Sequence, residues 1–416
     1  MSSPARPWSR RTFSALAHRN YRLMWTGTLV SHTGDWMDQV ALNWLVISTT
    51  GSPFDLALVN LCRGLPMLLF TLVGGAMADR FERRRLMMLT QTCAMALAFV
   101  LAAMVLSGTV SIALVLAVAT ARGVVVSFNL PARHSLIPAL VPLEDLPNAV
   151  ALSSMTQNVT KIVGPSLAGL IIGTLGTGAC FLINGVSFLA VLWTLHAMRV
   201  PKAGPPSTAA LPLRRSIAEG LRYVRDDRPV LLLVLVALVP TFFGHPYMTL
   251  LAVFAHIVHD VGPEGLGLLT SSAAAGAVVG GLLLATVPRT AVSGRAMLGF
   301  LGAFGALLCA FALNPVYLLA PVLLVGVGMM QIAYGATNNT ILQTRVPDRM
   351  RGRVMSILLL NRGLVQLGAA FAAALAGLIG APHALALTGA VIVVFSAFVW
   401  ARSAQIRAIG AEESRD

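Results

Sequence analysis

The sequence predicts an all-α integral membrane protein with twelve transmembrane helices in two six-helix halves. Three observations predict this fold class: the length of the apolar runs, the placement of the cations, and a repeat between the halves. Of the 416 residues, 56% are hydrophobic and only 11% are charged, whereas soluble domains carry roughly a quarter charged residues. Because lipid offers the backbone no hydrogen-bond partners, its polar groups must be paired within helices or a closed barrel. The runs lack the alternating pattern of a barrel.

Apolar runs of about 18 to 25 residues recur along the chain, which is the length that an α-helix needs to cross the hydrocarbon. In the first half we expect spans at 23–48, 54–78, 86–107, 110–129, 148–174 and 177–198. In the second half we expect spans at 229–256, 265–287, 296–314, 316–340, 354–379 and 382–402.

The 30 Lys and Arg residues indicate the orientation of the spans. Outside the apolar runs they fall in alternate gaps, and the odd-numbered gaps contain none. Because basic residues favour the cytoplasmic side of a membrane, this pattern predicts that both termini lie in the cytoplasm, and in a bacterium the membrane would be the cytoplasmic membrane. The formal net charge of +14 is therefore an orientation signal, and we expect no nucleic acid partner.

A polar stretch near the midpoint divides the chain. Three prolines make its first part a flexible linker, and Ser216 to Arg228 has the pattern of an amphipathic helix on the cytoplasmic membrane surface. We expect an N-terminal half at 1–198, a linker at 199–228, a C-terminal half at 229–402 and a cytoplasmic tail at 403–416.

The two halves also resemble each other in sequence. The segment SLIPALVPLEDLPNAV, continuing to GPSLAGLIIG, parallels TILQTRVPDRMRGRV, continuing to LAGLIG. Pro142 and Pro347 occupy matching places, each in the loop before the fifth helix of its half. Such a parallel repeat predicts two six-helix halves related by a pseudo-twofold axis normal to the membrane.

The gap after the second span reads GGAMADRFERRRLM and resembles the signature loop of the major facilitator superfamily. The resemblance implies the twelve-helix major facilitator fold and a cytoplasmic latch between the halves. The latch residues would be Gly75, Asp79, Arg80, Arg83 and Arg84, with Arg353 near the start of the eleventh helix. A glycine permits close helix approach, and a carboxylate can accept hydrogen bonds from a helix N-terminus. The alternative is that these arginines only determine the orientation of the spans in the membrane.

The fifth span contains VGPSLAG, in which Gly164, Pro165 and Gly169 resemble the Gly-Pro motif of the exporter branch of this superfamily. Pro165 removes a helical hydrogen bond and is expected to bend the helix. In the alternative, Gly and Pro are simply frequent in membrane helices. Segments 20–46, 63–70, 129–142 and 343–356 also resemble the subgroup of enterobactin exporters and macrolide efflux proteins.

Charged residues inside the spans are the strongest functional candidates, since each costs roughly 2.5–3.5 kcal/mol on insertion scales. Asp35 and Asp38 share a face of the first helix, and two carboxylates so close in a low dielectric favour a proton on one of them. Arg122 resembles the fourth-helix arginine that the superfamily associates with proton coupling. The predicted coupling element is an Asp35–Arg122 or Asp38–Arg122 pair, and the alternative is a permanent structural salt bridge.

The other charged residues inside the spans are Arg63, Lys161 and Arg362. They are possible cavity-lining residues, together with weaker, uncharged candidates, which are Gln157, Gln331, Asn338 and Asn361. A lone histidine in a bundle, such as His32, is more often a helix-to-helix hydrogen bond than a proton carrier. The four cysteines lie far apart inside apolar runs without metal-like spacing, so we expect no metal and no cofactor.

The sequence as a whole, with the family resemblance, predicts a monomeric secondary transporter rather than an enzyme. Its expected partners are a small-molecule cargo, protons and the lipid bilayer. The preferred reading is a proton-coupled exporter of a small amphipathic molecule, such as a siderophore, a macrolide or another drug, by alternating access. The alternative is an importer or facilitator of a polar solute on the same fold. A membrane enzyme or sensor is remote, because the sequence has no P-loop, metal-spaced ligand set or nucleophile elbow.

Overall fold

The computed structural model describes residues 13–198, 213–286, 293–347, 350, 354 and 361–409. The described chain is almost entirely helical and divides into two compact units. The first unit comprises residues 1–42 and 65–206, and the second comprises residues 43–64 and 207–416. The second unit therefore includes the end of the first long helix and the beginning of the next.

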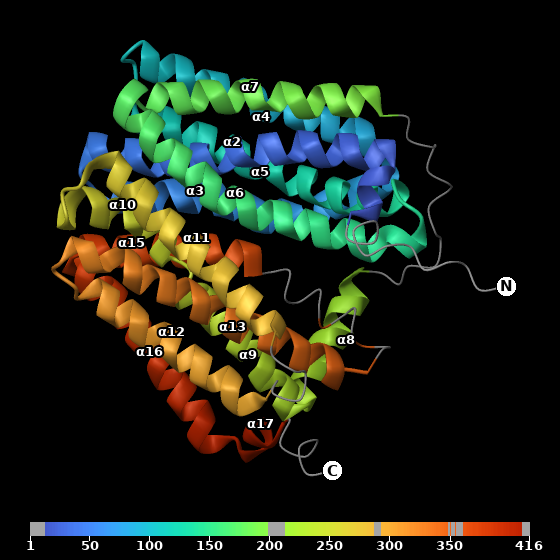
Figure 1. The fold of residues 1–416 in the computed structure, drawn as a ribbon, viewed down its shortest axis with the longest axis vertical. Coiled ribbons are helices and arrows are strands. Elements are labelled where there is room, and N and C mark those ends of the chain that lie inside the picture. The colour runs from blue at the N-terminus through green and yellow to red at the C-terminus, as the bar shows by residue number, and fades with distance from the viewer. Residues whose placement is uncertain are drawn as a thin grey trace. The chain divides into compact units, whose positions relative to one another are not determined.

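Six long helices supply most of the first unit, and they lie roughly along one direction (Figure 1). They are α2 (Arg19–Thr50), α3 (Pro53–Arg80), α4 (Arg83–Leu106), α5 (Ile112–Leu136), α6 (Leu146–Leu175) and α7 (Thr177–Ala197). Three short 3-10 turns accompany them: η1 (Ser14–Ala17), η2 (Ile137–Ala139) and η3 (Leu143–Asp145). The core is apolar, with Tyr21, Met87 and Phe188 at most 2% exposed.

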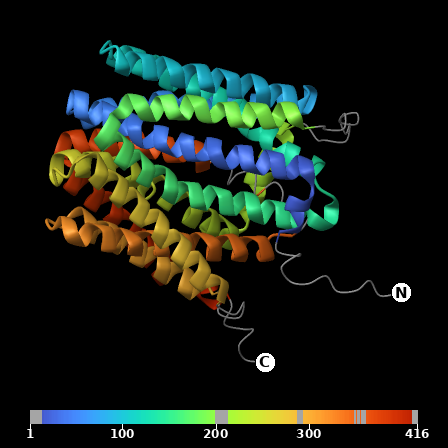
Figure 2. The same cartoon turned by 45° about the horizontal axis from the view of Figure 1, so that its top comes forward.

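The second unit contains the helices that follow in the chain, and Figure 2 shows them from a second direction. They are α8 (Leu213–Asp226), α9 (Arg228–Phe243), α10 (Tyr247–Val253), the π-helical turn η4 (Phe254–Val258), α11 (Gly262–Thr286), α12 (Gly294–Ala312), η6 (Tyr317–Leu319), α13 (Ala320–Arg345), α15 (Asn361–Ile379), α16 (Ala381–Arg402) and α17 (Ala404–Ala408). Residues 43–64 pack within this unit, since the Trp44 and His256 rings meet edge to face with centroids 5.2 Å apart.

One predicted span is interrupted. The run at 229–256 forms α9 and α10, separated by the turn at residues 244–246. Pro240 and Pro246 lack the amide hydrogens that a continuous helix would use, and the His245 amide donates instead to the Pro240 carbonyl at 3.0 Å. Just before α9, the Asp227 side chain accepts a hydrogen bond from the Val230 amide at 3.1 Å, which ends α8 and starts the new helix.

Ten described helical segments are long and apolar enough to cross a membrane. The other two predicted spans correspond to α2, whose apolar stretch contains Asp35 and Asp38, and to α15, whose apolar part covers residues 363–379. The outer faces carry large apolar side chains, with Trp193 and Leu282 each 66% exposed. Such surfaces suit lipid rather than water. The chain is thus a multi-pass membrane protein, and the exact count of twelve stays a prediction.

The sequence repeat has a counterpart in the backbone. Gly176 joins α6 to α7, and Gly380 joins α15 to α16. Both glycines have a φ of +82°, a conformation that other residues rarely adopt. Each predicted half therefore has a glycine with positive φ between its last two helices.

Candidate functional site

The two aspartates of α2 and the arginine of α5 form one cluster in the first unit. Arg122 donates from Nη1 to Asp38 Oδ1 at 2.6 Å and from Nη2 to Asp35 Oδ1 at 2.9 Å. The guanidinium therefore pairs with both carboxylates at once, rather than with one or the other. The side chains of Arg122 and Asp38 are 4% and 0% exposed, whereas that of Asp35 is 41% exposed. The Asp38 carboxylate is therefore buried inside the first unit, whereas the Asp35 carboxylate is accessible from the surface of that unit.

A third helix completes the cluster through Asn184 of α7. The Asn184 amide donates to Asp38 Oδ1 at 3.1 Å, so this oxygen accepts from both Arg122 and Asn184. The other carboxylate oxygen, Asp38 Oδ2, is buried and has no hydrogen-bond partner among the described residues. A buried carboxylate oxygen without a partner is energetically costly.

The Gly-Pro motif lies in α6, where the helix packs against α2. A Cβ atom on Gly164 would lie 2.5 Å from Trp36 Cβ and 3.0 Å from the Thr33 carbonyl oxygen. The glycine therefore allows two helices to approach closely. Pro165 and Gly169 are buried, and α6 continues through both as a single helix. The Lys161 ammonium, one turn earlier, lies 5.7 Å from the centroid of the Trp36 ring.

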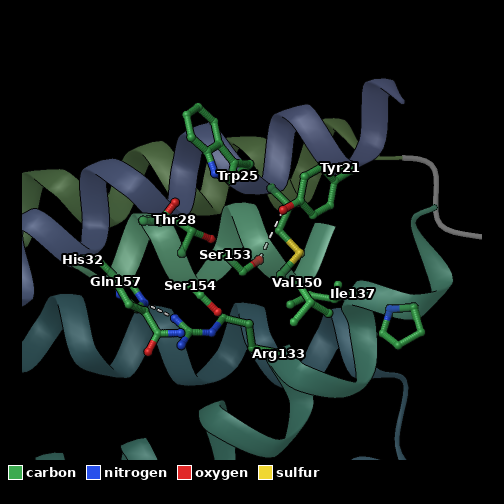
Figure 3. Close-up of a pocket in the computed structure, with 13 residues that line it drawn as sticks. Tyr21, Trp25, Thr28, His32, Arg133, Ile137, Val150, Ser153, Ser154 and Gln157 are labelled. Atoms are coloured by element: carbon green, nitrogen blue, oxygen red, sulfur yellow. Dashed lines mark hydrogen bonds between the residues drawn. The ribbon is translucent and has the colours of Figure 1, made fainter. Parts of the chain in front are cut away.

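Gln157 lines a pocket of about 130 Å³ between α2, α6 and the end of α5. Figure 3 shows the Arg133 side chain extending toward His32 and Gln157, with Ser154 beside it. Arg133 Nη1 contacts the Nε2 atom of the His32 ring. The sequence does not predict this pocket, because Arg133 lies in a gap between apolar runs, where cations indicate orientation.

The basic segment after α3 contacts the end of α7 within the first unit. Arg84 donates to the carbonyl oxygens of Leu195 at 2.6 Å and His196 at 2.9 Å, in the last turn of α7. Arg83 is half-buried. The surroundings of Gly75, the side chains of Asp79 and Arg80, and all of Arg353 lie outside what the structure describes. The latch therefore stays a prediction.

The remaining cavity candidates belong to the second unit. Gln331 accepts a hydrogen bond from the Tyr247 hydroxyl at 3.5 Å. Asn338 is 3% exposed, and its Oδ1 atom has no partner in the described part of the chain. Arg63 is half-buried in α3. Asn361 and Arg362 begin α15, but their side chains lie outside what the structure describes.

Asn184 is the residue of the α2–α5–α7 cluster that sequence reasoning did not identify. It is an amide inside an otherwise apolar run, and a buried amide needs hydrogen-bond partners. That signal was available in the sequence, but the rotation of α7 that directs Asn184 toward Asp38 was not.

The sequence is similar to transport proteins over nearly its full length. The model of the family described as "Transmembrane secretion effector" matches residues 10–415. The staphyloferrin A transporter of Staphylococcus aureus is 26% identical over 86% of this chain and 89% of its own length. The multidrug efflux pump Tap of Mycobacterium tuberculosis is 30% identical over 80% of each chain. Macrolide efflux protein A of Streptococcus pyogenes is 27% identical over 64% of this chain and 67% of its own length.

Solved structures show the same fold at lower identity. A bacterial homologue of the human lysosomal transporter Spinster, in an inward-facing conformation, aligns with a TM-score of 0.71. It is 18% identical, and the alignment covers 92% of this chain and 96% of that one. The nucleoside transporter NupG aligns with a TM-score of 0.71 at 10% identity, over 92% and 98% of the two chains.

Proposed function

The chain belongs to the transmembrane secretion effector family of the major facilitator superfamily, and from this premise we propose that it is a proton-coupled exporter of small amphipathic molecules. It is a membrane transporter with a small-molecule cargo, not an enzyme. Export, protons as the coupling ion, the class of cargo and alternating access are the proposal. Two of the three relatives named above are efflux proteins by name, which supports export.

The observation that carries proton coupling is the charge balance at Arg122. One guanidinium faces two carboxylates, so these three groups by themselves carry one excess negative charge when all are ionised. The Lys161 ammonium, 5.7 Å from the centroid of the Trp36 ring, is outside this count. A net charge in a membrane interior costs several kcal/mol. A single proton makes the cluster neutral, and Asp38 Oδ2, without a partner among the described residues, is a position that can hold it.

The unequal exposure of the two acids gives this proton a route. Asp35 is 41% exposed and shares the Arg122 guanidinium with the sealed Asp38. A proton that arrives at Asp35 weakens its ion pair, and Arg122 then pairs mainly with Asp38. A proton on Asp38 has the opposite effect. The two protonation states therefore link α2 to α5 through different ion pairs. A coupling ion can shift a conformational equilibrium only if it binds the two conformations with different free energies.

Transport by purified protein in proteoliposomes tests the proposal. With an imposed pH gradient and a radiolabelled macrolide, the wild type should accumulate cargo, and a protonophore should abolish the accumulation. Asp35→Asn and Asp38→Asn should each lose gradient-driven accumulation but retain exchange of labelled for unlabelled cargo. Asp55→Asn, in the first turn of α3, is the matched control and should transport normally.

Two outcomes would contradict the proposal. If both asparagine variants kept gradient-driven accumulation, the cluster would be a structural salt bridge, not the coupling element. If vesicles of known orientation took up cargo in the direction of the cytoplasm, the chain would be an importer. The same vesicles test the proposed cytoplasmic location of both termini by protease access. Light scattering of the purified protein tests the proposed monomer.

A further inference from the structure

The pocket between α2, α5 and α6 has a composition that the proton-coupling cluster does not explain. It lies wholly within the first unit, and on α2 its lining extends from Tyr21 to His32. At 1.5 Å per residue, this is about 16 Å of helix. The pocket is therefore elongated along α2, which suits a ligand with two chemically different ends.

One end of this pocket is cationic and rich in hydrogen-bond donors. The Arg133 guanidinium lies beside His32, Ser154 and Gln157 (Figure 3). None of the 13 described lining residues is Asp or Glu. A planar guanidinium with neighbouring hydroxyl and amide groups can bind two oxygens of a carboxylate or of a phosphate.

The remaining wall is largely apolar. Met24, Ile137 and Val150 contribute aliphatic surface, and Trp25 adds an aromatic ring. The Trp25 Nε1 atom donates to the Leu152 carbonyl oxygen at 3.3 Å, and the Tyr21 hydroxyl donates to the Ala149 carbonyl oxygen at 2.6 Å. These bonds fix both rings between α2 and α6, so the apolar wall is formed before any ligand enters.

We propose that this pocket binds an organic anion whose carboxylate or phosphate group pairs with Arg133 while its apolar part lies along Met24, Trp25 and Val150. A free amphipathic acid and an anionic phospholipid share this chemistry. The order of the groups along α2 favours the free acid. His32, at the cationic end, lies 13 residues after the start of α2 at Arg19, whereas Tyr21 lies near that start. A phospholipid bound along α2 would have its charged headgroup near the start of the helix and its acyl chains farther along it, which is the opposite order.

Fluorescence quenching by 11-bromoundecanoate tests the proposal, because bromine quenches a nearby tryptophan. The full-length protein in detergent should show saturable quenching by the acid but not by its methyl ester, which has no charge. Trp25→Phe should remove the saturable part. Arg133→Gln should weaken binding about 10- to 100-fold, as expected for the loss of a hydrogen bond to a charged group. Arg402→Gln, which removes an exposed arginine of α16, should bind as the wild type does.

Equal affinity of the wild type and Arg133→Gln, or equal binding of acid and ester, would overturn the proposal. If Arg133→Gln did not fold, Gln157→Leu and Ser154→Ala would replace it, each with an expected several-fold loss. A second experiment measures the affinity for 11-bromoundecanoate in nanodiscs with and without phosphatidylglycerol. Competition by this lipid would identify the anion as a phospholipid headgroup, whereas unchanged bromoundecanoate affinity would identify a free acid. None of these measurements requires transport, so the result is independent of the proton-coupling proposal.

Discussion

The Arg84 guanidinium, in the first turn of α4, donates to the carbonyl oxygen of Leu195 in the last turn of α7 at 2.6 Å. The last carbonyl groups of a helix have no intrahelical partners, and a cation near them is stabilising. The contact therefore fastens the beginning of one helix to the end of another. Arg84 belongs to the basic loop that resembles the family signature, and within the first unit its role is to cap α7.

Arg84→Gln should lower stability by about 1–2 kcal/mol, since it removes charge-assisted hydrogen bonds to two carbonyl groups. Arg85→Gln is the matched control. Arg85 pairs with Glu82 at 2.6 Å, but both side chains are more than half exposed, and exposed pairs contribute little. Thermal unfolding of the purified variants measures the difference. Equal melting temperatures for the two variants would contradict the capping role.

Arg122→Gln should destabilise the protein strongly, by about 3–5 kcal/mol, because it leaves the fully buried Asp38 without its cation. The double variant Arg122→Gln with Asp38→Asn should recover much of this loss, since no ion then remains unpaired in the interior. Asp35, at 41% exposure, can be hydrated in both variants. Fluorescence-detected gel filtration after a heating series compares them. A double variant less stable than the single one would indicate that Asp38 is held mainly by other groups.

Gly164→Ala should lower stability by about 1–3 kcal/mol, which is typical of overpacking. The added methyl group would meet Trp36 Cβ at 2.5 Å and the Thr33 carbonyl oxygen at 3.0 Å, neither at the end of a flexible chain. Gly299→Ala in α12 is the control, because a Cβ there meets nothing within 4 Å. It should be neutral or stabilising by up to about 1 kcal/mol, as Ala favours a helix over Gly. Thermal shifts of opposite sign are the expected result.

His259 should make the second unit less stable in acid. It follows η4, outside the spans, and its ring lies near those of Phe254 and Tyr317, with centroids 6.2 and 5.7 Å away. Burial lowers the pKa of His259 because the charged imidazolium loses hydration. The unfolded state, with a pKa of about 6.5, therefore binds the proton more readily. The contribution of His259 is present above that pH and is lost as the pH falls through the folded-state pKa.

The variant His259→Gln tests this pH dependence. Between pH 7.5 and pH 5, the melting temperature of the wild type should fall more than that of the variant. Parallel curves for the two proteins would show that the folded state accommodates a charged His259 as easily as the unfolded state does.

Local sequence patterns determined where the helices lie along the chain and which residues share a helix face. The length of the apolar runs was enough to locate the helices, because crossing lipid requires a helix of fixed length with paired backbone groups. The spacing of Asp35 and Asp38 placed them on one helix face, since three residues make nearly one turn. The prolines around residue 244 were visible in the sequence, but the break between α9 and α10 was not predicted, because proline is often accommodated in membrane helices.

The tertiary structure decided which polar groups meet. Whether Arg122 would pair with Asp35 or with Asp38 was open, and the structure gives both pairs, with Asn184 added from α7. Arg133 had the pattern of an orientation signal, and packing of α2 against α6 made it part of a pocket. The physical reason is the same in each case. Hydropathy fixes where a helix lies along the chain, whereas its rotation and its neighbours follow from close packing between segments far apart in sequence.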